Sequence, residues 1–128
     1  MKNKIICDTG VISRFLTQKD KNIVNTINKI GLDNVCITPL NKIELLNWIS
    51  GYKDITKEMR SKLLKSIKAL PIIHINEAIS KLAIEMSDDQ INSKPADTFI
   101  AAIAKYHKTP IYSLNNKHFE ILKAPVYS

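Results

Sequence analysis

Three acidic residues stand at positions from which their carboxylates could meet. Asp8 ends the short apolar run Ile5–Cys7, Glu44 lies in the segment "TPLNKIELLNW", and Asp97 lies in "KPADTFIAAIAKYH". Carboxylates that converge repel one another unless a cation compensates them, and oxygen-only ligands select hard ions such as Mg²⁺ or Mn²⁺. Such an ion can activate a water and stabilise the leaving oxygen of a phosphodiester.

Each acid alone also has a purely structural explanation. Asp8, followed by Thr9 and Gly10, suits the cap of a helix. Glu44 could simply face solvent, and Asp97 in the first turn of a helix interacts favourably with the helix dipole. The choice between cap and catalyst therefore depends on whether the elements around these residues bring them together.

Short runs rich in isoleucine and valine predict the strands. They lack a clean alternation, which is typical of strands buried on both faces of a parallel sheet. The predicted strands are Lys4–Cys7, Val35–Thr38, Pro71–Ile75 and Thr109–Ser113, with a possible fifth edge strand at Ala124–Tyr127.

Segments with helical spacing lie between these strands. A threonine cap and a proline at the first helical position predict one start at Thr38-Pro39. The predicted helices are Asp20–Ile30, Pro39–Gly51, Met59–Leu70, Asn76–Met86 and Pro95–His107. The alternation predicts an α/β fold, a three-layer α/β/α sandwich with a mostly parallel central sheet. Chemistry in such sheets occurs beyond the carboxyl ends of the strands.

Composition predicts one domain over residues 1–128, because this length is close to the commonest domain size. No apolar run approaches the roughly 20 residues that cross a membrane, and no secretory signal core follows the first residues, so we expect a cytoplasmic protein. The net charge of +7 favours a polyanionic partner, although solvated lysines give the same balance. Cys7 and Cys36 are predicted to be buried free thiols, and Ser87–Pro95 is the most loop-like stretch.

A family resemblance connects the acidic segments. "IICDTGVIS", "TPLNKIELL" and "PADTFIAAIAKYHKTPIYSLNNKHFEIL" resemble, in order, the successive motifs of PIN domains, particularly the VapC-type toxin ribonucleases. The resemblance implies a PIN-like fold and a Mg²⁺- or Mn²⁺-dependent endoribonuclease. It implies that Asp8 and Asp97 are metal ligands and that Glu44 completes the acidic cluster.

The same resemblance assigns further positions. Thr9 and Ser113 match hydroxyl residues of the motifs, and Asn115 stands at the fourth acidic position. The chain departs from the family pattern at Gly10, where an asparagine is frequent, and at His118, where an aspartate is frequent. His118 could contact RNA phosphate or face solvent.

The implied partners are an RNA substrate and a cognate antitoxin whose tail would cover the acidic site, with the toxin forming a homodimer and no membrane involved. Basic residues that flank the site could contact phosphate or be solvated. They are Arg14, Lys105, Lys117 and Lys123. The residues Trp48, Tyr52, Met59 and Leu63 could form a protein-binding surface or belong to the core.

Two other functions remain open. Asp8 after a strand could be the nucleophile of a phosphotransferase, but such enzymes typically carry a second acid two residues later, where this chain has Gly10. The chain could also be a PIN-like module that binds RNA or a partner without cleaving it, since Asn115 and His118 reduce the negative charge of the site.

Overall fold

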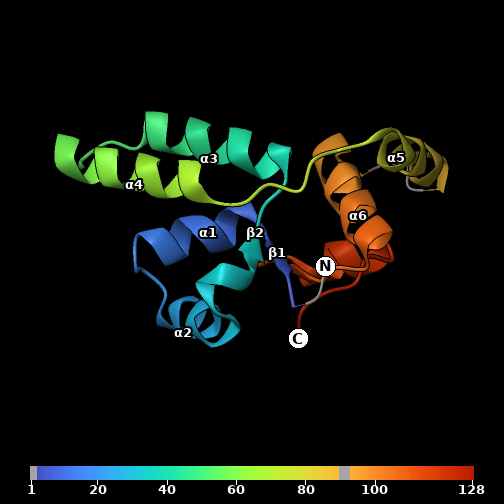
Figure 1. The fold of residues 1–128 in the computed structure, drawn as a ribbon. Helices are drawn as coiled ribbons and strands as arrows, with labels where there is room; N and C mark the ends of the chain where they lie inside the picture. Colours follow the sequence, from blue (N-terminus) through green and yellow to red (C-terminus); the bar gives the residue numbers. More distant parts are fainter. Residues whose placement is uncertain (1–2, 90–92) are drawn as a thin grey trace.

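A short parallel sheet forms the centre of the computed structural model, which describes residues 3–89 and 93–128. The strand order is β2-β1-β3, with β1 at Ile5–Cys7, β2 at Val35–Cys36 and β3 at Ile111–Tyr112 (Figure 1). Single parallel bridges extend both edges, Ile37 to Ile72 and Ile111 to Val126. The predicted strands at Pro71–Ile75 and Ala124–Tyr127 are therefore correctly placed, but each contributes one bridge to the sheet.

Helices cover both faces of the sheet. One face carries α1 (Thr9–Leu16), α2 (Lys21–Ile30), α3 (Pro39–Gly51) and α4 (Lys57–Ala69), with a 3₁₀ turn at Leu32–Asn34. The other face carries α5 (Glu77–Asp89), α6 (Pro95–His107) and α7 (Asn116–Ile121). The predicted three-layer α/β/α sandwich is confirmed (Figure 1).

The helix boundaries follow the capping residues. Thr38 caps α3 in a capping box with Asn41, and Asp20 caps α2 through the backbone N–H groups of Asn22 and Ile23. Pattern reading gave no helix for α1 or α7, because both are too short for a repeating apolar face. The start of the predicted loop Ser87–Pro95 belongs to α5, and its residues 90–92 lie outside the described residues.

Successive strand residues point to opposite faces of the sheet, so the hydrophobic core has one part on each face. Ile5 and Cys7 pack with α1 to α4, whereas Ile6 packs with α5 to α7. Cys36 shares the face of Ile6, so the two cysteines point to opposite faces and remain free and buried, as predicted. Burial raises the pKa of the Cys36 thiol to about 11, and burial raises that of Cys7 further, helped by repulsion from Cys36 and Asp8.

The carboxyl edge of the sheet collects polar residues. Each strand is followed closely by one of them: Asp8 after β1, Thr38 after β2 and Ser113 after β3. The Asp8 backbone N–H donates to the Tyr112 carbonyl at 3.0 Å, which fixes the end of β1 beside β3. No helix in the described residues is long and apolar enough to span a bilayer.

Candidate active site at the carboxyl edge of the sheet

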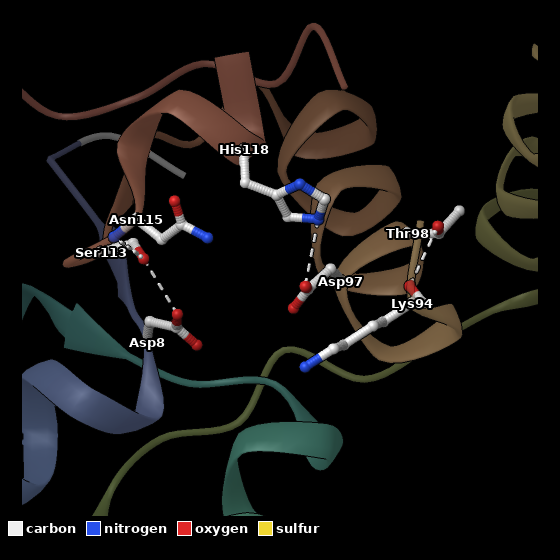
Figure 2. A network of polar contacts seen from close by, with 7 residues as sticks. All are labelled: Asp8, Lys94, Asp97, Thr98, Ser113, Asn115 and His118. Carbon is white, nitrogen blue, oxygen red and sulfur yellow. Dashed lines mark hydrogen bonds and ion pairs between the residues drawn. The ribbon is translucent and has the colours of Figure 1, made fainter. Parts of the chain in front are cut away.

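The carboxylate of Asp8 accepts three hydrogen bonds at this edge. Its Oδ1 accepts hydrogen bonds from the backbone N–H of Thr9 at 2.9 Å and from Nδ2 of Asn41 at 3.1 Å. Its Oδ2 accepts from the Ser113 hydroxyl at 3.0 Å (Figure 2). Asp8 therefore does cap α1, but donors from α3 and the β3 end also fix its carboxylate. A cap alone would need only the first of these bonds.

Asn41 is a functional candidate that sequence reasoning missed. It is completely buried, and its Oδ1 accepts from both the backbone N–H and the hydroxyl of Thr38, at 3.0 and 2.8 Å. Because the Thr38 N–H can only donate, the amide NH₂ of Asn41 must face Asp8. The capping pattern "TPLN" was the signal for it, since the third helical residue of a capping box points back over the helix start.

Glu44 connects to Asp8 through an intermediate residue. The Thr9 hydroxyl donates to Glu44 Oε1 at 2.7 Å, and Nδ2 of Asn41 lies 3.3 Å from the same hydroxyl oxygen. Asp8, Thr9, Asn41 and Glu44 thus form one network that joins the first turns of α1 and α3. Glu44 itself is exposed, as expected for its outer position on α3.

Asp97 approaches from the opposite layer. It lies in the first turn of α6, and its Oδ2 is 3.1 Å from Nε2 of His118 on α7. Figure 2 shows the Asp97 carboxylate directed toward the side on which Asp8 lies, with the Lys94 ammonium below it. His118 is three-quarters buried, so it is neither an exposed histidine nor free to contact RNA without leaving Asp97.

Ser113 and Asn115 complete the edge after β3. The Ser113 hydroxyl accepts from the Asn115 backbone N–H at 2.9 Å while it donates to Asp8. The Asn115 side chain is exposed at the start of α7, where its carbonyl oxygen can serve as a neutral ligand. The Asn115 backbone is therefore connected to Asp8 through the Ser113 hydroxyl.

Two residues flank this network. Gly10 fits because a Cβ there would lie 3.2 Å from Leu114 Cδ1 and 3.4 Å from Arg14 Nη1, so a larger residue would displace its neighbours. Arg14 is exposed on α1, and its Nη1 donates to the Gly10 carbonyl at 3.3 Å. The predicted substrate-binding residue Arg14 is thus bonded to the first turn of α1, and Lys117 is exposed on α7.

The donor set suits a hard divalent cation. The groups available at the edge are carboxylate, hydroxyl and amide oxygens, which Mg²⁺ and Mn²⁺ prefer. Within residues 3–89 and 93–128, however, no three histidine, cysteine or acidic side chains lie close enough together to hold one ion. The structure instead joins Glu44 to Thr9 and Asp97 to His118, and the Asp8 carboxylate accepts from Thr9, Asn41 and Ser113.

The fold and these side chains define an α/β/α protein with an acidic polar site beyond the carboxyl ends of parallel strands. The PIN domain family model matches residues 5–124, nearly the whole chain. The chain therefore belongs to the PIN domain family. No curated protein matches the sequence significantly.

Solved structures with a similar fold include a toxin–antitoxin complex. FitAcB from Neisseria gonorrhoeae aligns with a TM-score of 0.80 and 19% identity, over 97% of this chain and 96% of that chain. VapBC from Salmonella typhimurium, solved bound to DNA, gives 0.77 and 17% over 98% and 96%. A toxin–antitoxin complex from Klebsiella pneumoniae gives 0.73 and 16% over 91% and 90%. At these identities the similarity establishes the fold.

Proposed function

We propose that this protein is the toxin of a toxin–antitoxin pair and acts as a Mg²⁺- or Mn²⁺-dependent endoribonuclease. The observation that carries the proposal is the Asp8 carboxylate, held by three donors from three segments at the edge of a PIN-family sheet. Membership of the PIN family and the fold shared with toxin–antitoxin complexes support it. A net charge of +7 suits an RNA substrate.

The proposed mechanism assigns a role to each side chain. A divalent ion bound at this edge would supply Lewis-acid activation of water and of the phosphodiester. Asp8, directly after β1, and Asp97 on α6 would hold it as anionic ligands, and Asn115 would add a neutral oxygen. Asn41 and Ser113 orient the Asp8 carboxylate, since hydrogen bonds to an ionised carboxylate stabilise its charged form. Glu44, exposed beside Thr9, would accept a proton from the attacking water in this proposal.

The test is RNA cleavage by purified protein with Mg²⁺, Mn²⁺ or EDTA. We expect cleavage only with metal, and we expect Asp8→Asn and Asp97→Asn to lower it at least a hundredfold. Asp88→Asn, an exposed acid on α5, is the matched control. Mn²⁺ should also raise the melting temperature of the parent but not of Asp8→Asn. Cleavage by both site variants at the parental rate would exclude this function.

A binding module without cleavage is the second candidate. The contact between His118 and Asp97 favours it, because Asp97 Oδ2 already faces His118 Nε2 at 3.1 Å instead of lying free to hold a metal. RNA binding that is indifferent to EDTA and to Asp8→Asn, with no cleavage, would support it. A phosphotransferase that uses Asp8 as nucleophile finds no support in PIN family membership.

We further propose an antitoxin partner and a toxin homodimer in the cytoplasm. Of the residues considered for a protein surface, Leu63 belongs to the core, and Trp48 and Tyr52 pack partly against it. Met59 is exposed on α4. Molecular mass in solution, measured for the chain alone and with its co-expressed neighbouring gene product, tests both partners.

A further inference from the structure

A second polar hollow lies between α1 and α3, outside the network around Asp8. Its volume is about 390 Å³, within the range of ligand pockets. Its lining combines hydroxyl, basic and aromatic side chains with one acid. The residues are Ser13, Arg14, Thr17, Lys19, Asp20, Trp48 and Tyr52.

Two aromatic rings form one wall of this hollow. The ring centroids of Trp48 and Tyr52 are 5.3 Å apart, with the planes tilted by 49°. Both side chains pack partly against the core, and the Arg60 guanidinium donates to the Ile49 and Tyr52 carbonyls at the end of α3. The rings are therefore held in place before any ligand arrives, as in sites that stack nucleic-acid bases.

Basic groups stand beside the rings. Lys19 Nζ lies 5.1 Å from the centroid of the Tyr52 ring, and Arg14 is exposed on the adjacent turn of α1. The carboxylate of Asp20 is occupied by the backbone N–H groups of Asn22 and Ile23, at 3.0 and 3.3 Å. The hollow thus presents one cation over an aromatic ring and a second cation, Arg14, in its lining, a combination that suits the phosphates and bases of single strands.

The hollow lies farther along α3 from the acidic site. The bond between Thr9 and Glu44 joins the first turn of α1 to the second turn of α3. Glu44, Trp48 and Tyr52, the residue just past the end of α3, follow one another at spacings of four. At 1.5 Å per residue, Trp48 and Tyr52 lie about 6 and 12 Å along the helix from Glu44. A strand with one phosphate at Asp8 can therefore place a neighbouring nucleotide in the hollow.

We propose that this hollow binds the nucleotides next to the cleaved phosphate of single-stranded RNA. A base stacks on Trp48 or Tyr52, and Arg14 and Lys19 contact phosphates. The substrate is single-stranded, because a base must leave its duplex stack to reach these rings. This inference rests on the proposed ribonuclease function.

The sequence contains one tryptophan, so the emission of Trp48 reports directly on the hollow. The probes are a ten-nucleotide unstructured RNA of uridine and adenosine, and the same RNA with abasic sites at its centre, both titrated in EDTA. We expect the intact RNA to quench Trp48 and the abasic RNA to quench it much less. Tyr52→Leu should weaken binding about tenfold or more, the loss expected for one stacked base.

Matched controls separate the hollow from general charge and folding effects. Lys19→Gln and Arg14→Gln should each reduce the salt dependence of binding by about one ion, whereas Lys65→Gln on α4 should reduce it less. Tyr106→Leu, which removes an exposed ring on α6, should leave binding unchanged. Thermal melting checks that each variant is folded.

The outcomes distinguish this inference from the proposed function. If the protein cleaves RNA with Mn²⁺ but Trp48 emission does not respond and Tyr52→Leu cleaves at the parental rate, the inference is wrong and the ribonuclease stands. If Tyr52-dependent binding occurs without cleavage, the proposed function is wrong and the RNA site stands. If a co-purified partner protein shields Trp48 from acrylamide and RNA does not, the hollow is a protein-docking surface and the inference is wrong.

Discussion

Replacing Asn41 by aspartate tests how the site is held together. The substitution keeps the shape of the side chain and the oxygen that accepts from Thr38. It replaces the NH₂ group, 3.1 Å from Asp8 Oδ1, by a second carboxylate oxygen. Asn41→Asp therefore converts one charge-assisted hydrogen bond into a repulsion between two carboxylates, with little change in packing.

The magnitude follows from that distance. Two unit charges 3.1 Å apart repel by about 5 kcal/mol at an effective dielectric constant of about 20. The lost hydrogen bond to a charged group adds about 1.5–3 kcal/mol. Because Asp8 is only half-buried, rotation and solvent relieve part of this cost. We expect the free energy of unfolding to fall by about 2–4 kcal/mol, a large share of the 5–15 kcal/mol of a typical domain.

The loss of unfolding free energy in Asn41→Asp should depend on pH in a defined direction. The repulsion exists only when both carboxyls are ionised, so the folded variant binds protons more readily than its unfolded chain. The deficit in stability should therefore be full near pH 7.5 and shrink as the pH falls toward the ordinary aspartate pKa of about 3.9.

Urea unfolding in EDTA at pH 7.5 and at pH 4 measures this deficit. EDTA removes metal ions that could bridge the two carboxylates. The matched control is Asn47→Asp, an exposed position on the same helix, for which we expect a change within about 0.5 kcal/mol. If Asn41→Asp is as stable as the control at pH 7.5, the amide of Asn41 does not face Asp8 and the described network is incorrect.

Three further predictions concern stability. Phe119→Ala empties a fully buried position and should cost about 3–5 kcal/mol in urea unfolding; a cost below 1 kcal/mol would contradict its core position. Arg60→Met leaves two carbonyls at the end of α3 without their donor, and melting should show a loss of about 1–3 kcal/mol. Burial raises the thiol pKa of Cys7 and Cys36 above the ordinary 9.0, so unfolding free energy should fall as the pH rises past 9, less in a cysteine-free variant. Rapid labelling of either thiol in the native protein would contradict their burial.

Short-range sequence patterns predicted most of the helices and strands. The threonine cap and proline at Thr38-Pro39 predicted the start of α3, and Pro95–His107 matches α6 in full. These elements were readable because caps and helical periodicity act within a few residues of sequence. The strands were readable because a parallel sheet buried on both faces requires continuous apolar runs.

The composition of the acidic site was also partly predictable. A polar residue directly after a buried strand must emerge at the carboxyl edge of a parallel sheet, so Asp8 was placed correctly. The resemblance to PIN domains added Thr9, Ser113 and Asn115 to the three acidic residues, and the family match over residues 5–124 supports that resemblance. Their roles as ligands remain predictions.

Tertiary structure alone decided which polar groups contact one another. Asn41 donates to Asp8 across 33 residues of sequence, and Ser113 donates across 105. Asp97 meets His118 rather than the other carboxylates because α6 and α7 share one layer of the sandwich. The hollow beside Trp48 exists because α1 and α3 begin at the same sheet edge. Sequence determined the residues and elements by short-range preferences, whereas the contacts depend on how separate layers pack, which no local pattern encodes.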